Sequence, residues 1–538
     1  MLSLKNVPHP LSLLRDHLIK WRAPSNRVIR DAALVKGLET IEADTSYATF
    51  IDANGREHPC YRVDTGAVAK SIYSELLAAL DTSAIPYFTG GGADPWVKAL
   101  HVSSRDARLF VRSIVRNFAS DQRILVRVNN AAPQTVASLN IESGRYSRIT
   151  LLCIEKSAGK APALACSWID VNVWREVPGY SAQRLYETAT MNPHVRRLRY
   201  DTIERFLTNH EDLSALDSSL TAEATFPIDV VYTWVDDKDD AWQAAKRHHS
   251  GRAAEASDLS RSNHDERFTN RDELKYSMRS LEMFAPFVRN IYLVTSGHFP
   301  KWLRTDHPKV KIVPHREIYA QQSHLPTFNS SSIETQLHHI EGLSEHFLYF
   351  NDDFFLGDFC KPSDFFFANG TMKYFAAEQR AYEHDIDQKS EEYIAADRNA
   401  IELLKSHFGA FTRELMIHAP YPARRSILSE MENLFKEQFD ACASQRFRSH
   451  SDLRPIAFMQ YHFGFQKSQA VPATISNKYL ALWKPSIDRI LADLLRNRRY
   501  KTFCINDVGI PPSRLNWTNK QVRSFLESYF PFKSTFEK

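Results

Sequence analysis

The segment His346–Phe355 reads HFLYFNDDFF, an apolar and aromatic run that ends abruptly in Asn351, Asp352 and Asp353. Short runs of aromatic and β-prone residues are typical of buried strands. Open α/β sheets bind ligands beside the carboxyl ends of their strands, and adjacent carboxylates near a core are costly unless a cation or a substrate requires them. The segment therefore predicts a buried strand that delivers an acidic pair to a ligand-binding edge. A solvated Asn-Asp-Asp turn is the alternative.

A second strand with a similar ending lies upstream. Ile228–Val235 (IDVVYTWV) is β-branched and aromatic, and Asp236 and Asp237 follow it. Between the two strands, Arg271–Ala285 carries apolar residues at helical spacing. The order of strand, helix and strand predicts parallel crossover units and an α/β core with a mainly parallel sheet. The other elements predicted in this half are strands at 290–295 and 310–313 and a helix at 331–340 that opens with a Ser331–Glu334 capping box.

Four longer stretches carry a family resemblance. They are FPIDVVYTWVDD near 226–237, RFTNRDELKYSMRSLEMFAPFVRNIYLVTSGHFPKWL near 267–303, HLPTFNSSSIETQLHHIEGLSEHFLYFNDDFF near 324–357, and HAP with RFRSHSD near 418–465. In this order they resemble the four conserved regions of the Stealth family. Members of that family are hexose-1-phosphate transferases, among them bacterial capsule and exopolysaccharide polymerases and the catalytic part of the lysosomal-enzyme N-acetylglucosamine phosphotransferase. The closing CINDVG and SFLESYFPFKSTFEK resemble the ends of the capsule polymerases.

The resemblance implies a Rossmann-like (GT-A-like) nucleotide-sugar-binding core with C-terminal helical elements, which we expect over 226–538. We expect an accessory α/β domain over 1–225, with strands at 146–153 and 167–174 and a helix at 67–80. The implied reaction transfers a hexose-1-phosphate, expected to be N-acetylhexosamine-1-phosphate, from a UDP-sugar to a glycan hydroxyl and releases UMP. A metal-dependent glycosyltransferase that releases UDP and a non-catalytic glycan-assembly subunit are the alternatives.

Phosphoryl transfer of this kind needs charge neutralisation, positioned cationic donors and a base. Asp352 and Asp353 are the expected ligands of Mg²⁺ or Mn²⁺, since hard cations prefer carboxylate oxygens. His418 in IHAPYP matches the family block and is the expected base, because imidazole titrates near neutral pH. Arg448 in RFRSHSD and Arg279 on the central helix also match family positions, and their guanidinium groups suit phosphate oxygens.

Further candidates each have a structural alternative. Asp229 matches an aspartate of the first block, and capping or salt-bridging is as well supported there as catalysis. Trp234 is expected to stack on uracil or sugar, unless it belongs to the core. The sequence Val-Asp-Asp at 235–237 argues against the tight glycine turn found in related sequences. The remaining substrate-binding candidates are Asn351 and Asn506 (or turn residues), His324, and Arg271 (or an exposed helix residue), while His338 is expected to pack within a helix.

Composition limits the class of protein. A chain of 538 residues is expected to form more than one domain, and its 43% apolar and 25% charged residues are typical of a soluble globular protein. A formal net charge of +4 is too small to argue for a nucleic-acid partner. The cysteines are scattered without C-x-x-C spacing, which predicts neither a zinc site nor a disulfide framework and favours a reducing cytoplasm. They are Cys60, Cys153, Cys166, Cys360, Cys442 and Cys504.

Location is predicted from the same features. The sequence has no apolar stretch of membrane-spanning length, and prolines interrupt MLSLKNVPHPLSLL before a signal-type region forms. Basic residues at 5–36 and 496–501 predict solvated faces or contacts with anionic lipid. By family resemblance we expect a cytoplasmic protein with peripheral contact to the inner membrane or the capsule-export machinery, and an oligomer is left open. The polar stretch 211–227 predicts a domain boundary, and 237–270 a lid or a surface insertion.

Overall fold

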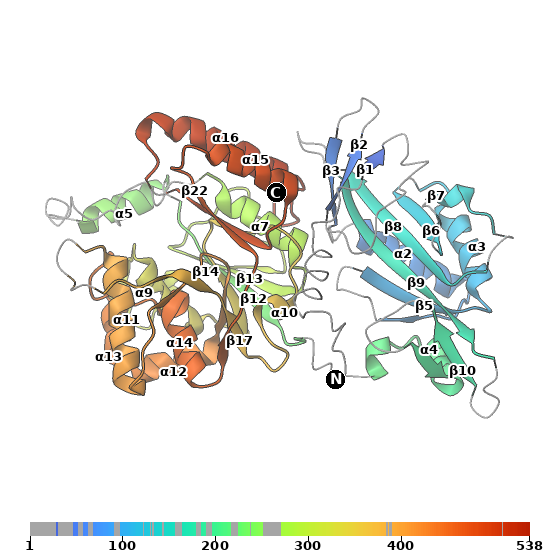
Figure 1. Ribbon diagram of the computed structural model, residues 1–538, viewed down its shortest axis with the longest axis horizontal. Helices are drawn as coiled ribbons and strands as arrows, with labels where there is room; N and C mark the ends of the chain where they lie inside the picture. Colours follow the sequence, from blue (N-terminus) through green and yellow to red (C-terminus); the bar gives the residue numbers. More distant parts are fainter. Residues whose placement is uncertain are drawn as a thin grey trace, which may run out of the picture. The chain divides into compact units, whose positions relative to one another are not determined.

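The computed structural model describes residues 28–30, 47–51, 57–62, 68–90, 97–121, 123–129, 131, 134–141, 145–156, 164–178, 184–189, 196–216, 224–236, 238–250, 271–383, 386, 390–507 and 509–538. The chain divides into two compact units (Figure 1): Met1–Leu216 with Arg496–Arg499, and Asp217–Leu495 with Tyr500–Lys538. Most of the basic segment 5–36 lies outside the described residues. So do Asp237 and, within the expected lid, 251–270.

The first unit, blue to green in Figure 1, is built on a sheet of eleven strands. Its longest strands, β8 (Arg148–Lys156) and β9 (Leu164–Glu176), pair antiparallel. Helices α2 (Val68–Thr82) and α3 (Ala107–Phe118) place their apolar residues against this sheet in one buried core. Apolar residues one helical turn apart produce this arrangement, because they line one face of each helix. The two strands and the helix predicted in this region are present.

The other elements of the first unit are short. They are β1 (Val28–Arg30), β2 (Tyr47–Ile51), β3 (Glu57–Arg62), β4 (Phe88–Thr89), β5 (Val97–Ser103), β6 (Ile124–Val128), β7 (Gln134–Thr135), η2 (Val136–Ser138), β10 (Leu185–Thr188), β11 (Arg197–Arg199), α4 (Tyr200–Asn209) and η3 (Leu213–Leu216). The principal strand order is β1-β2-β3-β9-β8-β6-β7, with β4, β5, β10 and β11 off this path. The unit is therefore an α/β layer of mixed strand direction.

The second unit centres on a five-stranded sheet of order β14-β13-β12-β15-β20. The strands are β12 (Ile228–Thr233), β13 (Val288–Thr295), β14 (Val310–Pro314), β15 (His346–Phe350) and β20 (Tyr421–Arg424). The first four are parallel, and only β20 runs antiparallel. Burial of the whole of β15 matches a strand covered on both faces. The predicted strands and the mainly parallel α/β core are confirmed.

Helix α7 (Glu273–Phe284) connects β12 to β13 and buries Leu274, Met278 and Leu281 on one face. Its Ser277 hydroxyl lies between Tyr232 of β12 and the carbonyl of Phe354, and Ser280 Oγ accepts a hydrogen bond of 3.0 Å from the Leu356 amide. Two small hydroxyls thus fix the helix to the strand that follows the acidic pair. The helix predicted at 271–285 is confirmed.

The helix predicted at 331–340 is wrong in length and in its cap. The structure has α9 (Ser330–Glu334) and then the separate turn η7 (Leu337–His339). Asn329 provides the cap, because its side chain accepts a hydrogen bond from the Ser331 amide. The Thr335 hydroxyl donates to the carbonyl of Ser332, and such bonds compete with a regular helix. Glu334 instead accepts a hydrogen bond from the Ile456 amide.

Smaller sheets and helices complete the second unit. Strands β16 (Phe354–Leu356), β23 (Thr502–Asn506) and β22 (Asn477–Ala481) form a three-stranded sheet, and β17 (Met372–Tyr374) and β18 (Ala376–Arg380) pair with β21 (Ala470–Pro472) and β19 (Glu414–Met416). The helices are α5 (Asp240–Ser250), α8 (His315–Ile318), η6 (Gln322–His324), α10 (Pro362–Phe365), α11 (Glu392–Phe408), α12 (Arg425–Leu434), α13 (Lys436–Ala443), η8 (Pro455–Met459), α14 (Gln460–Gln466), α15 (Ile487–Asn497), η9 (Pro512–Arg514) and α16 (Leu515–Tyr529).

Two expectations about the surface can be compared with this fold. Within the described parts of the chain, no helix is both long and apolar enough to span a membrane. The basic cluster at 496–501 is not a row of solvated cations, because Lys501 donates to the Phe359 carbonyl and to Asp364 at 2.9 Å and Arg498 is buried. These contacts leave fewer cations in the cluster for a lipid surface than the sequence predicts.

Candidate active site

The two strands that precede acidic residues end side by side. Strands β12 and β15 pair in parallel with Tyr232 opposite Phe350, so the residues that follow them leave the sheet at the same edge. The Thr233 and Tyr349 hydroxyls, 3.0 Å apart, link the two strands at this point. In a sheet of this kind the carboxyl edge is the common position for a ligand.

The acidic pair occupies a half-buried turn that the Phe354 amide closes by donating to the Asn351 carbonyl at 3.1 Å. Burial raises the pKa of Asp352 well above its ordinary value, and the charges of Glu273, Asp353 and Asp507 raise it further. Burial also raises the pKa of Asp353 to about 7, although a hydrogen bond from Cys504 Sγ to Oδ2, 3.3 Å long, opposes this. Asp353 Oδ1 is buried and has no hydrogen-bond partner among the described residues.

Two further carboxylates join this pair, and sequence reasoning missed both. Glu273 opens α7, and Asp507 follows the last residue of β23. We define Asp352, Asp353, Glu273 and Asp507 as the acidic cluster. A usable sequence signal existed for Asp507, because it follows a short apolar strand just as Asp352 does.

Arg271 is the cation that the structure places in contact with the acidic cluster. Its guanidinium Nη1 lies 2.7 Å from Asp507 Oδ2 and 3.3 Å from Glu273 Oε1, and Nε donates to Asn519 Oδ1 at 2.6 Å. The side chain is buried, so it is not the exposed helix residue that was its alternative. Four carboxyl groups thus share one guanidinium, and the protein raises the pKa of Asp352, Asp353 and Glu273.

This donor set fits a divalent cation. Buried charges are normally paired or bind a metal, and the unpartnered Asp353 Oδ1 and the single guanidinium among four carboxyl groups meet that description. The oxygens of the acidic cluster do not form a closed set of three neighbouring ligand atoms. Among the described residues, three ligand atoms lie within 4.8 Å of one another only in a different group, His338, His339 and Glu432. Mg²⁺ is usually held by one or two carboxylates plus substrate phosphate oxygens, so a closed cage is not required.

His418 lies in the segment between β19 and β20, near the first residue of β16. Its ring is 6.3 Å from the ring of Phe354, the residue after Asp353, and 5.2 Å from the ring of Tyr479 on β22. Water reaches the His418 side chain, yet the surrounding protein desolvates the charged form and lowers its pKa to about 4, with the charge of Arg454 as the second cause. The imidazole is therefore neutral at pH 7 and able to accept a proton.

Arg448 approaches the same edge from another segment. Its Nη2 donates to Ser330 Oγ of α9 at 3.0 Å. Burial raises the pKa of Glu334 to about 7, and the charges of Arg454 and Arg448 oppose this, so both cations lie near that carboxyl group. Arg454, which sequence reasoning missed, is largely buried and pairs with Asp397 at 2.7 Å. Arg448 and Arg454 thus place positive charge on the side of the edge formed by α9.

Asp229 and Arg279 do not join this group. Asp229 is fully buried near the amino end of β12, where its carboxylate pairs with Arg289 at 2.6 and 2.9 Å and accepts the Ser344 amide at 2.7 Å. Arg279 pairs with both oxygens of Glu537 at 2.8 Å and donates to the Phe530 carbonyl at 2.9 Å. The structure therefore favours the structural alternative for Asp229 and gives Arg279 the same kind of role.

The other sequence candidates lie in the core, in a turn, at the end of a strand and near the surface. Trp234 is buried with its ring 5.5 Å from His298, which matches its core alternative. Asn351 lies in the turn before β16 and its carbonyl accepts the Phe354 amide at 3.1 Å. Asn506 ends β23 directly before Asp507. His324 is partly exposed in η6.

The comparison with known families was made on the whole chain. The models of Stealth protein conserved regions 1, 2, 3 and 4 match residues 226–248, 267–374, 417–464 and 492–538. The exopolysaccharide phosphotransferase SCO6023 of Streptomyces coelicolor is 32% identical over 483 residues, which cover 86% of this chain and 81% of that protein. The chain belongs to the Stealth family. As a Stealth protein it carries Asp352 and Asp353 in region 2, His418 and Arg448 in region 3, and Asp507 in region 4.

The sequence-based division of the conserved regions needs one correction. The blocks at 267–303 and 324–357 are parts of a single region 2, the block at 418–465 is region 3, and region 4 is the C-terminal segment from 492. The residues between the two blocks, 304–323, include β14 and α8 of the same unit, so no structural boundary separates the blocks.

Other relatives of this Stealth chain are matched over part of their length. SCO2592 of S. coelicolor, also an exopolysaccharide phosphotransferase, is 38% identical over 70% of this chain and 40% of that protein. CpsY of Mycobacterium tuberculosis, of the same description, is 36% identical over 59% of each chain. The chain spans 40 to 58% of the length of SCO2592, SCO6021 and SCO2594. A crystal structure of the galactosyltransferase LgtC matches 57% of this chain and 97% of that one at 12% identity with a TM-score of 0.28.

Proposed function

We propose that this protein transfers a hexose-1-phosphate, with N-acetylhexosamine as the sugar, from a UDP-sugar to a glycan hydroxyl. The product is a phosphodiester-linked capsular or exopolysaccharide, and UMP is released. The observation that carries the proposal is the convergence of the acidic cluster, His418 and Arg448 around the carboxyl edge of β12 and β15 in a Stealth chain. Relatives described as exopolysaccharide phosphotransferases support the substrate class.

The proposed reaction is a displacement at phosphorus. The acceptor oxygen forms a bond to the phosphorus that carries the sugar, and the bond from that phosphorus to the oxygen of UMP breaks. The bond between the sugar C1 and its oxygen stays intact. The acceptor proton moves to His418, whose neutral ring has a free lone pair at pH 7 because its pKa lies at about 4.

Tyr479 is the proposed contact for the acceptor sugar. Tyr479 is 43% exposed, which is a large fraction for an aromatic residue. Its ring lies 5.2 Å from the ring of His418. Aromatic faces of this kind bind the apolar faces of sugars. A sugar that rests on Tyr479 therefore has a hydroxyl close to the base.

Charge on the transferred phosphoryl group is balanced by protein cations and by a divalent ion. Arg448 presents guanidinium donors at the α9 side of the edge, where a fork of N–H groups suits phosphate oxygens. Asp352 and Asp353, with Asp507 next to them, would hold Mg²⁺ or Mn²⁺, and Arg271 keeps Asp507 and Glu273 in place. A bound ion of this type neutralises charge on the diphosphate.

The competing function is a glycosyltransferase of similar architecture, which would break the C1–oxygen bond and release UDP. The purified protein should be incubated with UDP-N-acetylhexosamines, a glycan primer and Mg²⁺, and the released nucleotide identified by chromatography. UMP together with a phosphodiester phosphorus signal in the product supports the proposal. Release of UDP alone would assign the chain to the competing class, and absence of any nucleotide release with every donor would favour a non-catalytic assembly subunit.

Location and partners are also part of the proposal. We place the protein in the cytoplasm, in peripheral contact with the inner face of the membrane or with the capsule-export machinery, because polysaccharide donors are made on that side. Co-sedimentation with vesicles that contain anionic lipid tests the membrane contact. Protein that stays in the supernatant at low salt would argue against it.

A further inference from the structure

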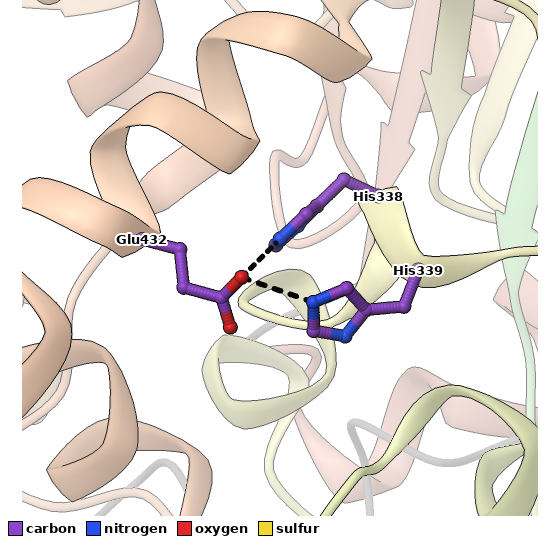
Figure 2. Close-up of side chains that lie close together, drawn as sticks. All are labelled: His338, His339 and Glu432. Carbon is purple, nitrogen blue, oxygen red and sulfur yellow. Dashed lines mark hydrogen bonds and ion pairs between the residues drawn. The ribbon is translucent and has the colours of Figure 1, made fainter.

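Apart from the acidic cluster, a second group of metal-binding side chains lies in the catalytic unit. Figure 2 shows His338 and His339 of η7 directed toward Glu432 of α12. Nε2 of His338 lies 2.7 Å from Glu432 Oε2, and Nε2 of His339 lies 3.0 Å from the same oxygen. All three ligand atoms are within 4.8 Å of one another. The cysteine spacing predicted no zinc site, but it carried no information about this group.

The two ring nitrogens of His339 both face acceptors, and the contact with Glu432 raises the pKa of the ring, so an ion at Nε2 would displace a proton that Nε2 shares with this carboxylate. Nδ1 of His339 is 3.0 Å from the Ile318 carbonyl. A carbonyl only accepts, so Nδ1 carries a ring proton and Nε2 is the ligand atom. Metal-binding histidines are commonly held in this way, by donation from the other ring nitrogen to a carbonyl.

His338 is fixed less firmly in its tautomer. Its Nδ1 is buried and has no hydrogen-bond partner within the described part of the chain. Glu432 is therefore the group that decides whether Nε2 carries a proton. An ion at Nε2 shifts the ring proton to Nδ1, which makes no other hydrogen bond in the described part of the chain.

The distances are close to those of a tetrahedral site. Zinc bonds of about 2.0–2.1 Å separate neighbouring ligand atoms by about 3.3 Å. The present separations of 2.7 and 3.0 Å need to open by only a few tenths of an ångström. The side chains of His339 and Glu432 are 31% and 29% exposed, whereas that of His338 is 2% exposed, so water can reach a fourth position.

We propose that His338, His339 and Glu432 form a structural zinc site that braces α12 against η7. Two imidazoles and one carboxylate are a donor set that suits Zn²⁺ and not Mg²⁺, which prefers oxygen ligands. The turn η7 directly follows α9, whose Ser330 contacts Arg448 and whose Glu334 bonds the Ile456 amide. The ion thus stabilises the segment on which the cationic side of the active site is built. It is distinct from the divalent ion of the acidic cluster.

The test uses the full chain without a histidine tag. The protein is exposed to Zn²⁺, desalted and analysed for metal content, and the Zn²⁺-dependent rise in Tm is measured in parallel. We expect one retained zinc per wild-type chain, and at least about tenfold weaker retention in His339→Ala and in Glu432→Gln. Glu432→Gln keeps an oxygen that accepts from His338, so it serves as the variant least disturbing to the fold.

Two controls separate this site from other metal binding. Asp353→Asn, in the acidic cluster, and His407→Ala, an exposed histidine on α11, should retain zinc as the wild type does. Cobalt substitution should give the intense visible absorption of a tetrahedral site in the wild type and lose it in Glu432→Gln. No zinc retained by folded wild-type protein, or equal retention in His339→Ala and Glu432→Gln, would overturn the proposal.

Discussion

The protonation state of His418 depends on the protein around its ring as well as on the solution pH. The surrounding protein and the charge of Arg454 lower the pKa of His418 to about 4, so the ring is neutral throughout the neutral range. Below this pKa the ring becomes protonated and can no longer accept a proton, and the folded protein disfavours this imidazolium form. The sequence alone predicted a group that titrates near neutrality, and the structure moves this titration to acid pH.

The first prediction concerns this base. His418→Ala should lower kcat at pH 7.5 by at least about a hundredfold, as expected when positioned proton transfer is lost. The wild-type kcat should rise with pH around pH 4 and then stay level through pH 7, when chemistry is rate-limiting. Steady-state rates across pH 4 to 8 check both statements. His407→Ala, an exposed-histidine control, should leave kcat unchanged, and an ascending limb near pH 6.5 in the wild type would contradict the assignment.

A second prediction concerns the buried charge of Asp353. Asp353→Asn should abolish transfer, yet raise the Tm of the metal-free protein by a few degrees at pH 8, because the fold raises the pKa of this carboxyl to about 7 and a neutral amide avoids the cost of its charged form. Differential scanning calorimetry in chelator checks the stability, and an activity assay with added Mg²⁺ checks the function. A lower Tm combined with full activity would show that Asp353 is structural.

For Asp229 we predict the opposite result, a loss of stability without a loss of catalysis. Asp229→Asn weakens a bidentate pair with Arg289 and the bonds from two backbone amides, so it should destabilise the fold by about 2–4 kcal/mol. The folded fraction should keep its kcat within about threefold, since the residue lies at the amino end of β12. Urea unfolding and active-site-normalised rates are the measurements. Loss of kcat at unchanged stability would return Asp229 to the catalytic group.

At the scale of the element, a few buried polar side chains position the short segments around the edge. Asn329 is the main example, since Oδ1 caps α9 by accepting the Ser331 amide while Nδ2 donates to Asp452 at 2.9 and 3.1 Å. Asp452 also accepts the Ser449 amide at 3.0 Å, next to Arg448. One side chain therefore joins the start of α9 to the segment that carries the proposed phosphate-binding arginine.

Removal of this link should affect stability and catalysis together. Asn329→Ala should cost about 1–3 kcal/mol, as expected for a lost cap and an unsatisfied buried carboxylate, and should lower kcat more than it raises the KM for the donor. Chemical denaturation and steady-state kinetics are the measurements. Thr327→Val, which loses a neighbouring hydroxyl, is the matched control and should have the smaller effect on kcat. An unchanged kcat in Asn329→Ala would mean that Arg448 is positioned independently of this link.

At the scale of the whole molecule, sequence patterns predicted the features that depend on residues close together in the chain. Aromatic and β-branched runs fixed the strands of the parallel core, and their polar ends located Asp352 and Asp353 at its carboxyl edge. Contacts between distant residues were beyond that reasoning. Arg271 and Asp507 are 236 positions apart, and the link between His418 and Arg454 depends on how β20 and η8 pack. The pairing of Asp229 with Arg289, 60 positions away, is another contact that spacing does not reveal.

The first unit shows the same limit. Its long strands β8 and β9 were predicted from alternating apolar residues, whereas the strand order around them depends on non-local pairing that no spacing reveals. In the second unit, the C-terminal segment is joined to α7 through Arg279 and Glu537, residues 258 positions apart. The family regions at both ends of the match thus belong to one folded body.

The central claim is that the bond to phosphorus, and not the bond to the sugar carbon, is exchanged. The most direct measurement uses a UDP-sugar labelled with ¹⁸O in the bridge between C1 and the β-phosphorus, followed by mass spectrometry of the glycan and the released nucleotide. We predict that the label is retained in the glycan, between the sugar and its new phosphodiester, and that the released UMP is unlabelled. Label found in released UDP, with an unlabelled glycan, would contradict it.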